Sequence, residues 1–388
     1  MSASTDLHHR IATLRRDLHA HPELAFEERR TADVVAAHLE RLGIEVHRGL
    51  AGTGVVARIR VGTGKRSIGL RADMDALPLD ELNGFPHRSR HEGRMHACGH
   101  DGHTAMLLGA AEVLAQRAKA GAFDGTVHLI FQPAEEHEGG GRVMVEEGLF
   151  ERFPMDMVFG LHNWPGLPAG SIGVTEGPVM AGTDRFEIEI TGHGGHAAMP
   201  HQAVDVVLAG SALVQALQSL VSRNTDPLDS AVVSVTRFHA GHADNVLPET
   251  AVLGGTVRTF NGELQDALEE GVRRICTGIE ATYRVGIDLR YERGYPPTVN
   301  AAAPCGIARE VAQHVASDGL VYLQLPPSMG AEDFAYMAKV VPACYVWLGN
   351  GPGEGGCMLH SPHYDFNDEI IATGIRYWVR LVERALAP

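Results

Sequence analysis

The sequence of 388 residues is poor in cysteine, in aromatic side chains and in positive charge. Its cysteines are odd in number and far apart, so we expect reduced thiols rather than a disulfide framework, at positions 98, 276, 305, 344 and 357. The 33 basic residues against 48 acidic ones give a net charge of −15, which on average repels a phosphate backbone or an anionic membrane. This balance excludes nucleic acid and membranes as main partners and favours a small-molecule substrate.

Long apolar runs are also missing. No window approaches 18 uninterrupted apolar residues, and no apolar core of signal-peptide length follows the charges at the start, so we expect a cytoplasmic protein. The apolar content of 44% and the charged content of 21% are ordinary for globular proteins. At roughly 100 to 200 residues per domain, the length predicts two domains.

Glycine and histidine are abundant, with 45 and 22 residues. The glycine content is well above the usual value of roughly 7% and predicts many tight loops. A scattered histidine is most often a surface residue. The positions of the histidines therefore decide what they indicate.

Short apolar strands are predicted at 54–61, 67–73 and 125–132, and helices at 31–42 and 104–119. The same alternation resumes later, with a helix at 303–316, a strand at 343–348 and a helix at 368–386. Strands that alternate with helices indicate an α/β fold, a mixed and mostly parallel sheet flanked by helices, whose ligand sites form at the carboxyl ends of the strands. Asp73, Gln132 and His162 fall just past predicted strands, so the chemistry should collect on one edge.

Residues 182–292 follow a different pattern. Strands are predicted at 184–190, 230–238, 250–259 and 287–291, with helices at 204–221 and 262–283. This βαββαβ order is the ferredoxin-like unit. We therefore expect an inserted domain at 182–292 within a first domain made of 1–181 and 293–388.

The strongest local motif is H-A-C-G-H-D-G-H at 96–103. Thiolate and imidazole are typical ligands of borderline transition metals, and the glycine between Cys98 and His100 lets both side chains point into one site. The alternative is a buried thiol beside surface histidines.

Adjacent carboxylates follow a predicted strand in Q-P-A-E-E at 132–136. Neighbouring side chains of an extended chain point in opposite directions, so Glu136 can bind metal while Glu135 faces the attacking water. A solvated acidic loop is the alternative.

Two further histidines complete a possible metal site, His162 in G-L-H-N-W and His360 in M-L-H-S-P-H-Y. Each alone is equally consistent with a surface or hydrogen-bonded core histidine. Together with Cys98, His100 and Glu136 they provide five ligands, which suits two metal ions that share one ligand. Glu135 remains as the general base of metal-assisted hydrolysis.

At this point the sequence resembles the amidohydrolase branch of the metallopeptidases, which contains hippurate hydrolases, N-acyl-L-amino-acid amidohydrolases and indoleacetyl-amino-acid hydrolases. The resemblance runs nearly the whole length and rests on R-R-D-L-H-A-H-P-E-L at 15–24, R-A-D-M-D-A-L-P at 71–78, M-H-A-C-G-H-D-G-H at 95–103, Q-P-A-E-E at 132–136, H-G-G-H-A-A-M-P-H at 193–201, N-V-L-P-E at 245–249, G-A-E-D-F at 330–334 and L-H-S-P-H-Y-D-F-N-D at 359–368. It implies a zinc-peptidase-like catalytic domain, an inserted domain that dimerises or caps the substrate, and a homodimer or homotetramer.

The resemblance also implies roles for single residues. The metal ligands are Cys98 as the bridge, His100, Glu136, His162 and His360, and Glu135 is the general base. His196 reaches the active site of a neighbouring subunit and steadies the oxyanion, whereas Asn245 and Arg258 hold the free carboxylate of the substrate. An exposed turn histidine and a surface arginine are the alternatives for His196 and Arg258.

R-A-D-M-D departs from the wider metallopeptidase pattern. Asp73 occupies the place of a usual metal-binding histidine and stays unassigned, while Asp75 occupies that of the acidic residue supporting it; a strand-end loop pair is the alternative for both. The bridging thiolate is a second departure, because the wider family bridges with aspartate. Sulfur favours zinc, cobalt or nickel, whereas related amidohydrolases are often handled as manganese enzymes, so the identity of the two divalent ions stays open.

The function that follows is metal-dependent hydrolysis of the amide bond of hippurate-type N-acyl amino acids, which releases a carboxylic acid and an amino acid. A deacetylase of N-acetylated diamino acids or a dipeptidase is the alternative among enzymes. A non-catalytic metal-dependent binder of acylated amino acids is the alternative of another class. Glu135 argues against a binder, which has no use for a base beside the metals.

Overall fold

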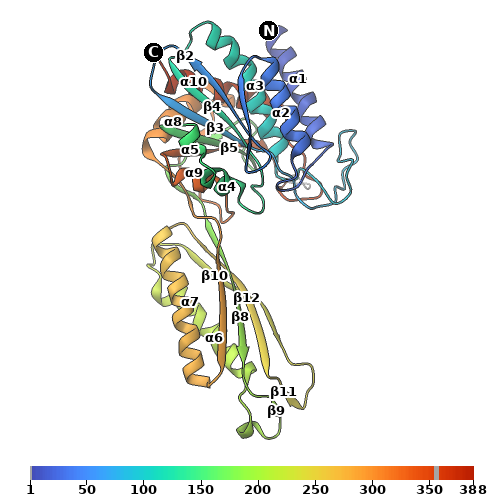
Figure 1. Cartoon of the computed structure of the whole chain (residues 1–388), viewed down its shortest axis with the longest axis vertical. Coiled ribbons are helices and arrows are strands. Elements are labelled where there is room, and N and C mark those ends of the chain that lie inside the picture. The colour runs from blue at the N-terminus through green and yellow to red at the C-terminus, as the bar shows by residue number, and fades with distance from the viewer. Residues whose placement is uncertain (1, 354–357) are drawn as a thin grey trace. The chain divides into compact units, whose positions relative to one another are not determined.

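The computed structural model describes residues 2–353 and 358–388, and the chain divides into two compact units (Figure 1). The main unit comprises Met1–Val179, Val299–Pro326 and Asp333–Pro388, and the inserted unit comprises Met180–Thr298 and Pro327–Glu332. The predicted domains, 1–181 with 293–388 and 182–292, differ from these units by a few residues at each junction. The prediction also assigned residues 327–332 to the main domain, whereas they belong to the inserted unit.

The main unit is built on an eight-stranded mixed sheet in the order β1-β2-β4-β3-β5-β16-β6-β15. The central strands β4, β3, β5 and β16 run parallel, so their carboxyl ends meet at one edge, while β1 and β2 are antiparallel additions. The strands are β1 (Glu45–Leu50), β2 (Gly54–Val61), β3 (Ser67–Asp73), β4 (Gly125–Gln132), β5 (Met157–Pro165), β6 (Ile172–Gly173), β15 (Val321–Tyr322) and β16 (Ala343–Gly351).

Strands β4 and β16 are buried along their whole length, as expected for central parallel strands covered on both faces. Helices α1, α3, α8 and α10 pack with one another on one layer, and the short helices α4 and α9 pack together, α9 against β5 and β16. The helices are α1 (Ser2–His19), α2 (Arg29–Arg41), α3 (His100–Lys119), α4 (Gly140–Glu146), α5 (Leu149–Arg152), α8 (Ala302–Val315), α9 (Phe334–Ala338) and α10 (Ile371–Ala385).

The inserted unit has a four-stranded antiparallel sheet in the order β10-β12-β8-β13, with α6 and α7 packed on it. In β8 buried Phe186, Ile188 and Ile190 alternate with more exposed residues, because only one face of this sheet is covered. The chain order β8-α6-β10-β12-α7-β13 confirms the predicted ferredoxin-like insertion. The elements are β8 (Gly182–Thr191), α6 (Val206–Ser219), β10 (Ala231–Ala240), β12 (Thr250–Thr259), α7 (Gly262–Tyr283) and β13 (Gly286–Arg293).

Two short ribbons complete the described strands. β9 (Gly195–His196) pairs with β11 (Val246–Leu247), next to the end of the inserted sheet where Thr191 pairs with Thr250. β7 (Gly177–Met180) pairs with β14 (Thr298–Asn300).

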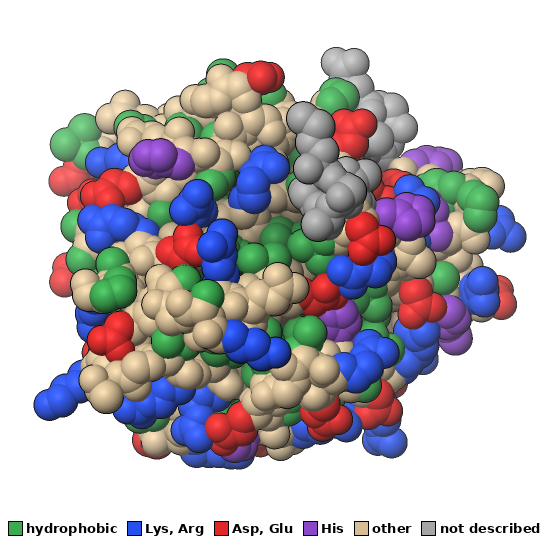
Figure 2. Space-filling view, turned by 90° about the horizontal axis from the view of Figure 1, so that it is seen from above, with side chains coloured by type: hydrophobic (Ala, Val, Ile, Leu, Met, Phe, Trp, Pro, Cys, Tyr) green, Lys and Arg blue, Asp and Glu red, His purple; other side chains and the backbone are tan. Residues whose placement is uncertain are grey.

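One segment, Val206–Asn224, is long and apolar enough to cross a membrane by length and composition alone. This is weak evidence, because core helices pass the same test. Val206, Ala209, Leu213 and Leu217 of this segment are fully buried against the inserted sheet. On the face drawn in Figure 2, Lys and Arg side chains lie among Asp and Glu side chains, so the described residues on this face form no patch of a single sign.

The predicted strands 54–61, 67–73 and 125–132 are confirmed with the same bounds. Most of the other predicted bounds differ from the structure by one to three residues. The larger differences are that α3 begins at His100 rather than at 104 and that His162 lies inside β5 rather than past its end. The four described cysteines are free thiols, as expected, and Cys357 lies outside the described residues.

Candidate metal centre

Cys98 and His100 are brought together by the left-handed glycine between them. Gly99 has a φ of +96° and precedes the first residue of α3. A Cβ at this position would lie 2.1 Å from Asn163 Oδ1, so only glycine fits. The turn therefore holds a thiol and an imidazole on either side of one glycine, and both side chains are buried.

His162, from β5, faces Cys98 with a distance of 3.4 Å between Nε2 and Sγ. Its Nδ1 lies 2.7 Å from the carbonyl oxygen of Asn163 and donates to it, which leaves the Nε2 lone pair free. Burial holds the pKa of His162 well below its usual range, so the ring is neutral. A neutral imidazole with a free Nε2 is the form that binds metal.

Glu136 and His360 form the other side of the centre, with 3.3 Å between Oε1 and Nε2. The His360 side chain is 55% exposed, and its backbone has a φ of +63°, a conformation unusual for a residue with a side chain. Its N–H donates to the carbonyl oxygen of Ala97 at 2.7 Å. This bond ties the late segment that carries His360 to the residue beside Cys98.

The five predicted ligands therefore form two groups that share one residue. Potential ligand atoms of Cys98, His100 and His162 lie within 4.8 Å of one another, and so do those of Cys98, Glu136 and His360. His100 Nε2 and Glu136 Oε1 are 3.9 Å apart and buried. His100 Nε2 has no hydrogen-bond partner among the described residues, and Glu136 Oε1 has the ion-pair contact with His360. Although burial lowers it, the neighbouring carboxylates raise the pKa of His100 to about 10, so metal binding at Nε2 would displace a proton. Buried polar atoms with few partners are costly, and cations would satisfy both atoms, so the residues fit two metal ions.

The surroundings of Cys98 favour its protonated form. Burial and the neighbouring carboxylates of Glu136 and Glu135 raise the pKa of the Cys98 thiol well above its usual value. The thiol therefore stays protonated unless positive charge is added. Metal binding to this cysteine must release its proton.

The two aspartates of R-A-D-M-D have different partners. Asp75 Oδ1 lies 3.2 Å from His100 Nδ1, and its Oδ2 accepts from the backbone N–H of Glu136 at 2.9 Å. Asp75 thus orients His100 so that Nε2 faces the centre, which suits its predicted supporting role. Asp73 is held instead by Arg71 at 2.7 Å and by His103 Nδ1 at 2.6 Å.

The loop that carries Glu135 and Glu136 is fixed by other buried carboxylates. Ala134 lies in the left-handed region with a φ of +56°, and its N–H donates to Glu28 Oε1 at 2.8 Å. Glu28 also accepts from Thr53 Oγ1 at 2.7 Å. Burial raises the pKa of Glu28 to about 7. Glu28, invisible to the sequence analysis, therefore holds the backbone immediately before the two glutamates.

We expect Glu28→Ala to lower kcat by roughly 10²-fold, because small misplacements of catalytic groups have effects of that size. Glu28→Gln should lose less, since its amide oxygen can still accept from Ala134. The control is Glu147→Ala, which removes a carboxylate bonded to the N–H of Ala51 instead of the catalytic loop. Steady-state kinetics with metal content measured on the same samples tests this, and equal kcat in Glu28→Ala and Glu147→Ala contradicts the positioning role.

Gln132 is tied down at the start of the same loop. Arg71 Nε donates to Gln132 Oε1 at 2.8 Å, and Gln132 Nε2 donates to Asp333 Oδ1 at 2.7 Å. Asp333 also pairs with Arg71 at 3.0 Å. These fully buried charges explain the position of the motif G-A-E-D-F beside Q-P-A-E-E.

The motif near the amino terminus supports the start of α3. Buried Arg15 and His19 both contact Asp101, which follows His100, at 3.4 and 2.9 Å. Although burial lowers it, the Asp101 carboxylate raises the pKa of His19 to about 9, so His19 is charged at neutral pH. Two buried cations thus fix the first turn of α3.

In the inserted unit the β9–β11 ribbon brings His196 and Asn245 together, since the N–H of Ala197 donates to the carbonyl oxygen of Asn245 at 3.0 Å. The N–H of Ala198 donates to His196 Nδ1 at 3.1 Å. Nδ1 of His196 is therefore an acceptor, and Nε2 is the nitrogen that carries a proton and presents a donor. Both residues are exposed.

Arg258 lies toward the opposite end of the same sheet, where β12 pairs it with Thr183. Eight residues separate it from Thr250, about 26 Å at roughly 3.3 Å per residue, and the ribbon lies beyond Thr250 (Figure 1). Asn245 and Arg258 therefore lie toward opposite ends of the inserted sheet within one chain. Arg258 is partly buried, and its Nη1 is buried with no partner among the described residues.

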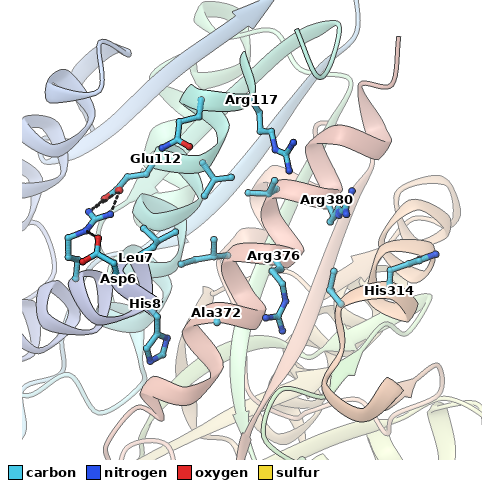
Figure 3. A pocket seen from close by; sticks show the side chains of 15 residues that line it. Asp6, Leu7, His8, Glu112, Arg117, His314, Ala372, Arg376 and Arg380 are labelled. Carbon is cyan, nitrogen blue, oxygen red and sulfur yellow. Dashed lines mark hydrogen bonds and ion pairs between the residues drawn. The ribbon is translucent and has the colours of Figure 1, made fainter. Parts of the chain in front are cut away.

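A cavity of about 600 Å³ among α1, α3, α8 and α10 contains none of the predicted site residues (Figure 3). Its basic side chains are largely occupied. Arg10 forms an ion pair with Glu112, and Arg117 and Arg380 both contact Glu383. The chemistry of the main unit therefore collects at the sheet edge and not in this cavity.

Comparison with known proteins places these observations in a family. A family model described as peptidase family M20/M25/M40 matches residues 69–384. Hippurate hydrolase of Campylobacter jejuni is 40% identical over 381 residues, 98% of each chain. N-acetylcysteine deacetylase of Bacillus subtilis is also 40% identical, over 98% of this chain and 97% of its own.

The fold has a solved counterpart. The crystal structure of the Bacillus subtilis YXEP protein, a dinuclear metal-binding peptidase from the M20 family, matches with a TM-score of 0.85 and 37% identity. The match covers 98% of this chain and 99% of that one. Both units and the candidate metal centre therefore fall within the matched region.

Proposed function

The chain belongs to peptidase family M20/M25/M40 and is a dinuclear metal amidohydrolase that acts on N-acyl amino acids, and on this premise we propose that its substrates are of the hippurate type. The products are a carboxylic acid and a free amino acid. The observation that carries the proposal is the pair of ligand groups that share Cys98, with Glu135 beside them.

Divalent ions held by Cys98, His100, Glu136, His162 and His360 supply Lewis acidity toward water and toward the amide carbonyl. Glu135 Oε2 lies 4.0 Å from His100 Nε2, and the Glu135 side chain is nearly buried. We assign Glu135 to take a proton from the attacking water and to pass it to the amine that leaves. Asp75 keeps His100 oriented during this transfer.

His196 and Asn245 are proposed to act on the site of a second subunit in a homodimer. The ribbon that carries both residues is exposed, so it is accessible to another chain. The Nε2–H of His196 can donate a hydrogen bond to a developing oxyanion. Arg258 and Asn245 cannot reach one carboxylate within one chain, but residues from two chains can. A homodimer therefore reconciles the separated positions with a shared carboxylate.

Arg258 is proposed to read the free carboxylate of the substrate. Its buried Nη1 lacks a partner among the described residues, and a guanidinium and a carboxylate form paired charge-assisted bonds. We expect N-acyl amino acids to be hydrolysed on the order of 10²-fold better than the matching amino acid amides. Arg258→Ala should remove most of this preference, and Arg258→Lys should keep part of it.

The ratio of kcat/KM for N-benzoylglycine to that for its amide measures this preference. Arg237→Ala is the matched control, because Arg237 lies on the neighbouring strand β10 and is paired with Glu187. A ratio that stays the same in Arg258→Ala removes Arg258 from the site.

A panel of N-acyl amino acids, N-acetylated diamino acids and dipeptides tests the function as a whole with metal-loaded protein. Hydrolysis confined to diamino acid or dipeptide substrates favours those alternatives. Binding of N-acyl amino acids without hydrolysis of any panel member returns the protein to the class of binders. Because its described cysteines are free thiols, we also propose a reducing compartment, the cytoplasm.

A further inference from the structure

Two tryptophans stack on each other beside the metal centre. The rings of Trp164 on β5 and Trp347 on β16 have centroids 4.0 Å apart and lie within 8° of parallel. In the parallel register Trp347 pairs with His162, and Trp164 is two residues further along β5. Since side chains two residues apart share a face, both indoles lie on the same face of the sheet as His162.

This stacked pair contacts His162, one of the candidate metal ligands. The rings of Trp164 and His162 have centroids 6.0 Å apart, with an angle of 75° between their planes. His162 Nε2 in turn faces Cys98. An acyl group whose carbonyl lies at the metal centre therefore has the indole of Trp164 close by. Aromatic rings interact when their centroids are roughly 4.5 to 7 Å apart, so an aromatic acyl group could contact this indole.

The two indoles differ in exposure. Trp347 is only 6% exposed, and its Nε1–H is buried without a hydrogen-bond partner among the described residues. Trp164 is partly exposed. A buried ring thus backs an accessible one. The stacked pair therefore forms a flat surface. Buried donors in native proteins are normally paired, so the unpaired Nε1–H of Trp347 calls for a functional or structural reason.

We propose that Trp164, backed by Trp347, is the acyl-group subsite and selects flat aromatic acyl groups over small aliphatic ones. This inference rests on the proposed function and adds the residues that set the substrate class. Overall identity does not make this choice, because relatives at the same 40% identity are a hippurate hydrolase and an N-acetylcysteine deacetylase. An offset-stacked benzoyl ring gains contact with the indole that an acetyl group cannot make.

The kinetic test compares kcat/KM for N-benzoylglycine and N-acetylglycine. Trp164→Ala should lower the benzoyl-to-acetyl ratio by roughly 10- to 100-fold, and Trp164→Phe should keep most of it. The control is Trp378→Phe, which changes a core tryptophan of α10 that is 1% exposed. A folded, metal-loaded Trp164→Ala protein with an unchanged ratio, or an equal change in Trp378→Phe, overturns the inference.

Binding can be followed without turnover, because the chain has only three tryptophans. Benzoate should quench the intrinsic fluorescence of the wild-type protein, and acetate at the same concentration should not. Trp164→Phe should lose most of the quenching, and Trp378→Phe should keep it. Quenching that persists in Trp164→Phe places the aromatic group elsewhere and overturns the inference. This second test does not need the Trp164→Ala protein, so it decides the question even if that variant does not fold.

The two hypotheses fail in different ways. Wild-type protein that hydrolyses no N-acyl amino acid contradicts the proposed function, whereas the benzoate titration still decides on the aromatic subsite. Normal hydrolysis with a benzoyl-to-acetyl ratio that does not depend on Trp164 leaves the function in place and removes the subsite.

Discussion

Glu135→Gln is expected to keep both metal ions and to lose turnover by about 10²- to 10⁴-fold, because the amide keeps the shape of the side chain and cannot accept the proton. Glu135 is only 6% exposed, so no bulk base reaches the same position easily. Elemental analysis and hydrolysis of N-benzoylglycine should be measured on the same preparation. Glu138→Gln is the matched control, since Glu138 is an exposed residue of the same loop.

Two outcomes oppose this role. A Glu135→Gln protein with nearly normal kcat shows that another group takes the proton. Loss of metal from the same variant assigns Glu135 to the ligands instead, an interpretation that its proximity to His100 and Glu136 also permits.

Cys98→Ala is expected to lose bound metal at both positions, because Cys98 belongs to both ligand groups. Removal of a ligand should lower metal affinity by roughly 100-fold or more, since even partners outside the ligand shell contribute 10- to 100-fold. Activity at limiting metal should fall in parallel. Cys98→Asp should recover much of both, because a carboxylate can bridge two ions in the same way.

Metal content, kcat and thermal unfolding with and without a chelator measure this prediction. Ions that bind only the folded chain raise its stability, so chelation should lower the unfolding temperature of wild type and leave Cys98→Ala nearly unchanged. Cys276→Ala, a change of another buried thiol in the inserted unit, is the control and should behave as wild type. A Cys98→Ala protein with two tightly bound ions contradicts the shared position of this thiol.

Local sequence patterns were sufficient for much of the fold. Period and composition located β2, β3 and β4 to the residue, because their apolar runs end in glycine, aspartate or glutamine. The helical spacing of apolar residues also located α7 with its true bounds. Helix α1 was missed, since its buried side includes Arg15 and His19, which periodicity counts as polar.

The candidate ligands could be predicted because they stand in short motifs with characteristic chemistry. Their supports could not, because Glu28, His103 and Asp333 act through pairing partners 30 to 200 residues away in the chain, roughly, which no local pattern reveals. Trp164 is part of the motif G-L-H-N-W, which the sequence analysis considered only for His162. Its stacking on Trp347 depends on the register between β5 and β16, and the sequence does not state that register.

The position of His360 along the chain also sets an order of events during synthesis. The group of Cys98, His100 and His162 is complete once residue 162 has emerged, whereas the group of Cys98, Glu136 and His360 waits for about 200 further residues. At roughly 5 to 20 residues per second, that interval is about 10 to 40 s. During it, β5 lacks its neighbour β16, and only one of the two groups of candidate ligands is complete in the nascent chain. The second metal position, and with it any hydrolytic activity, arises only as the last strand and helix of the main unit close the sheet.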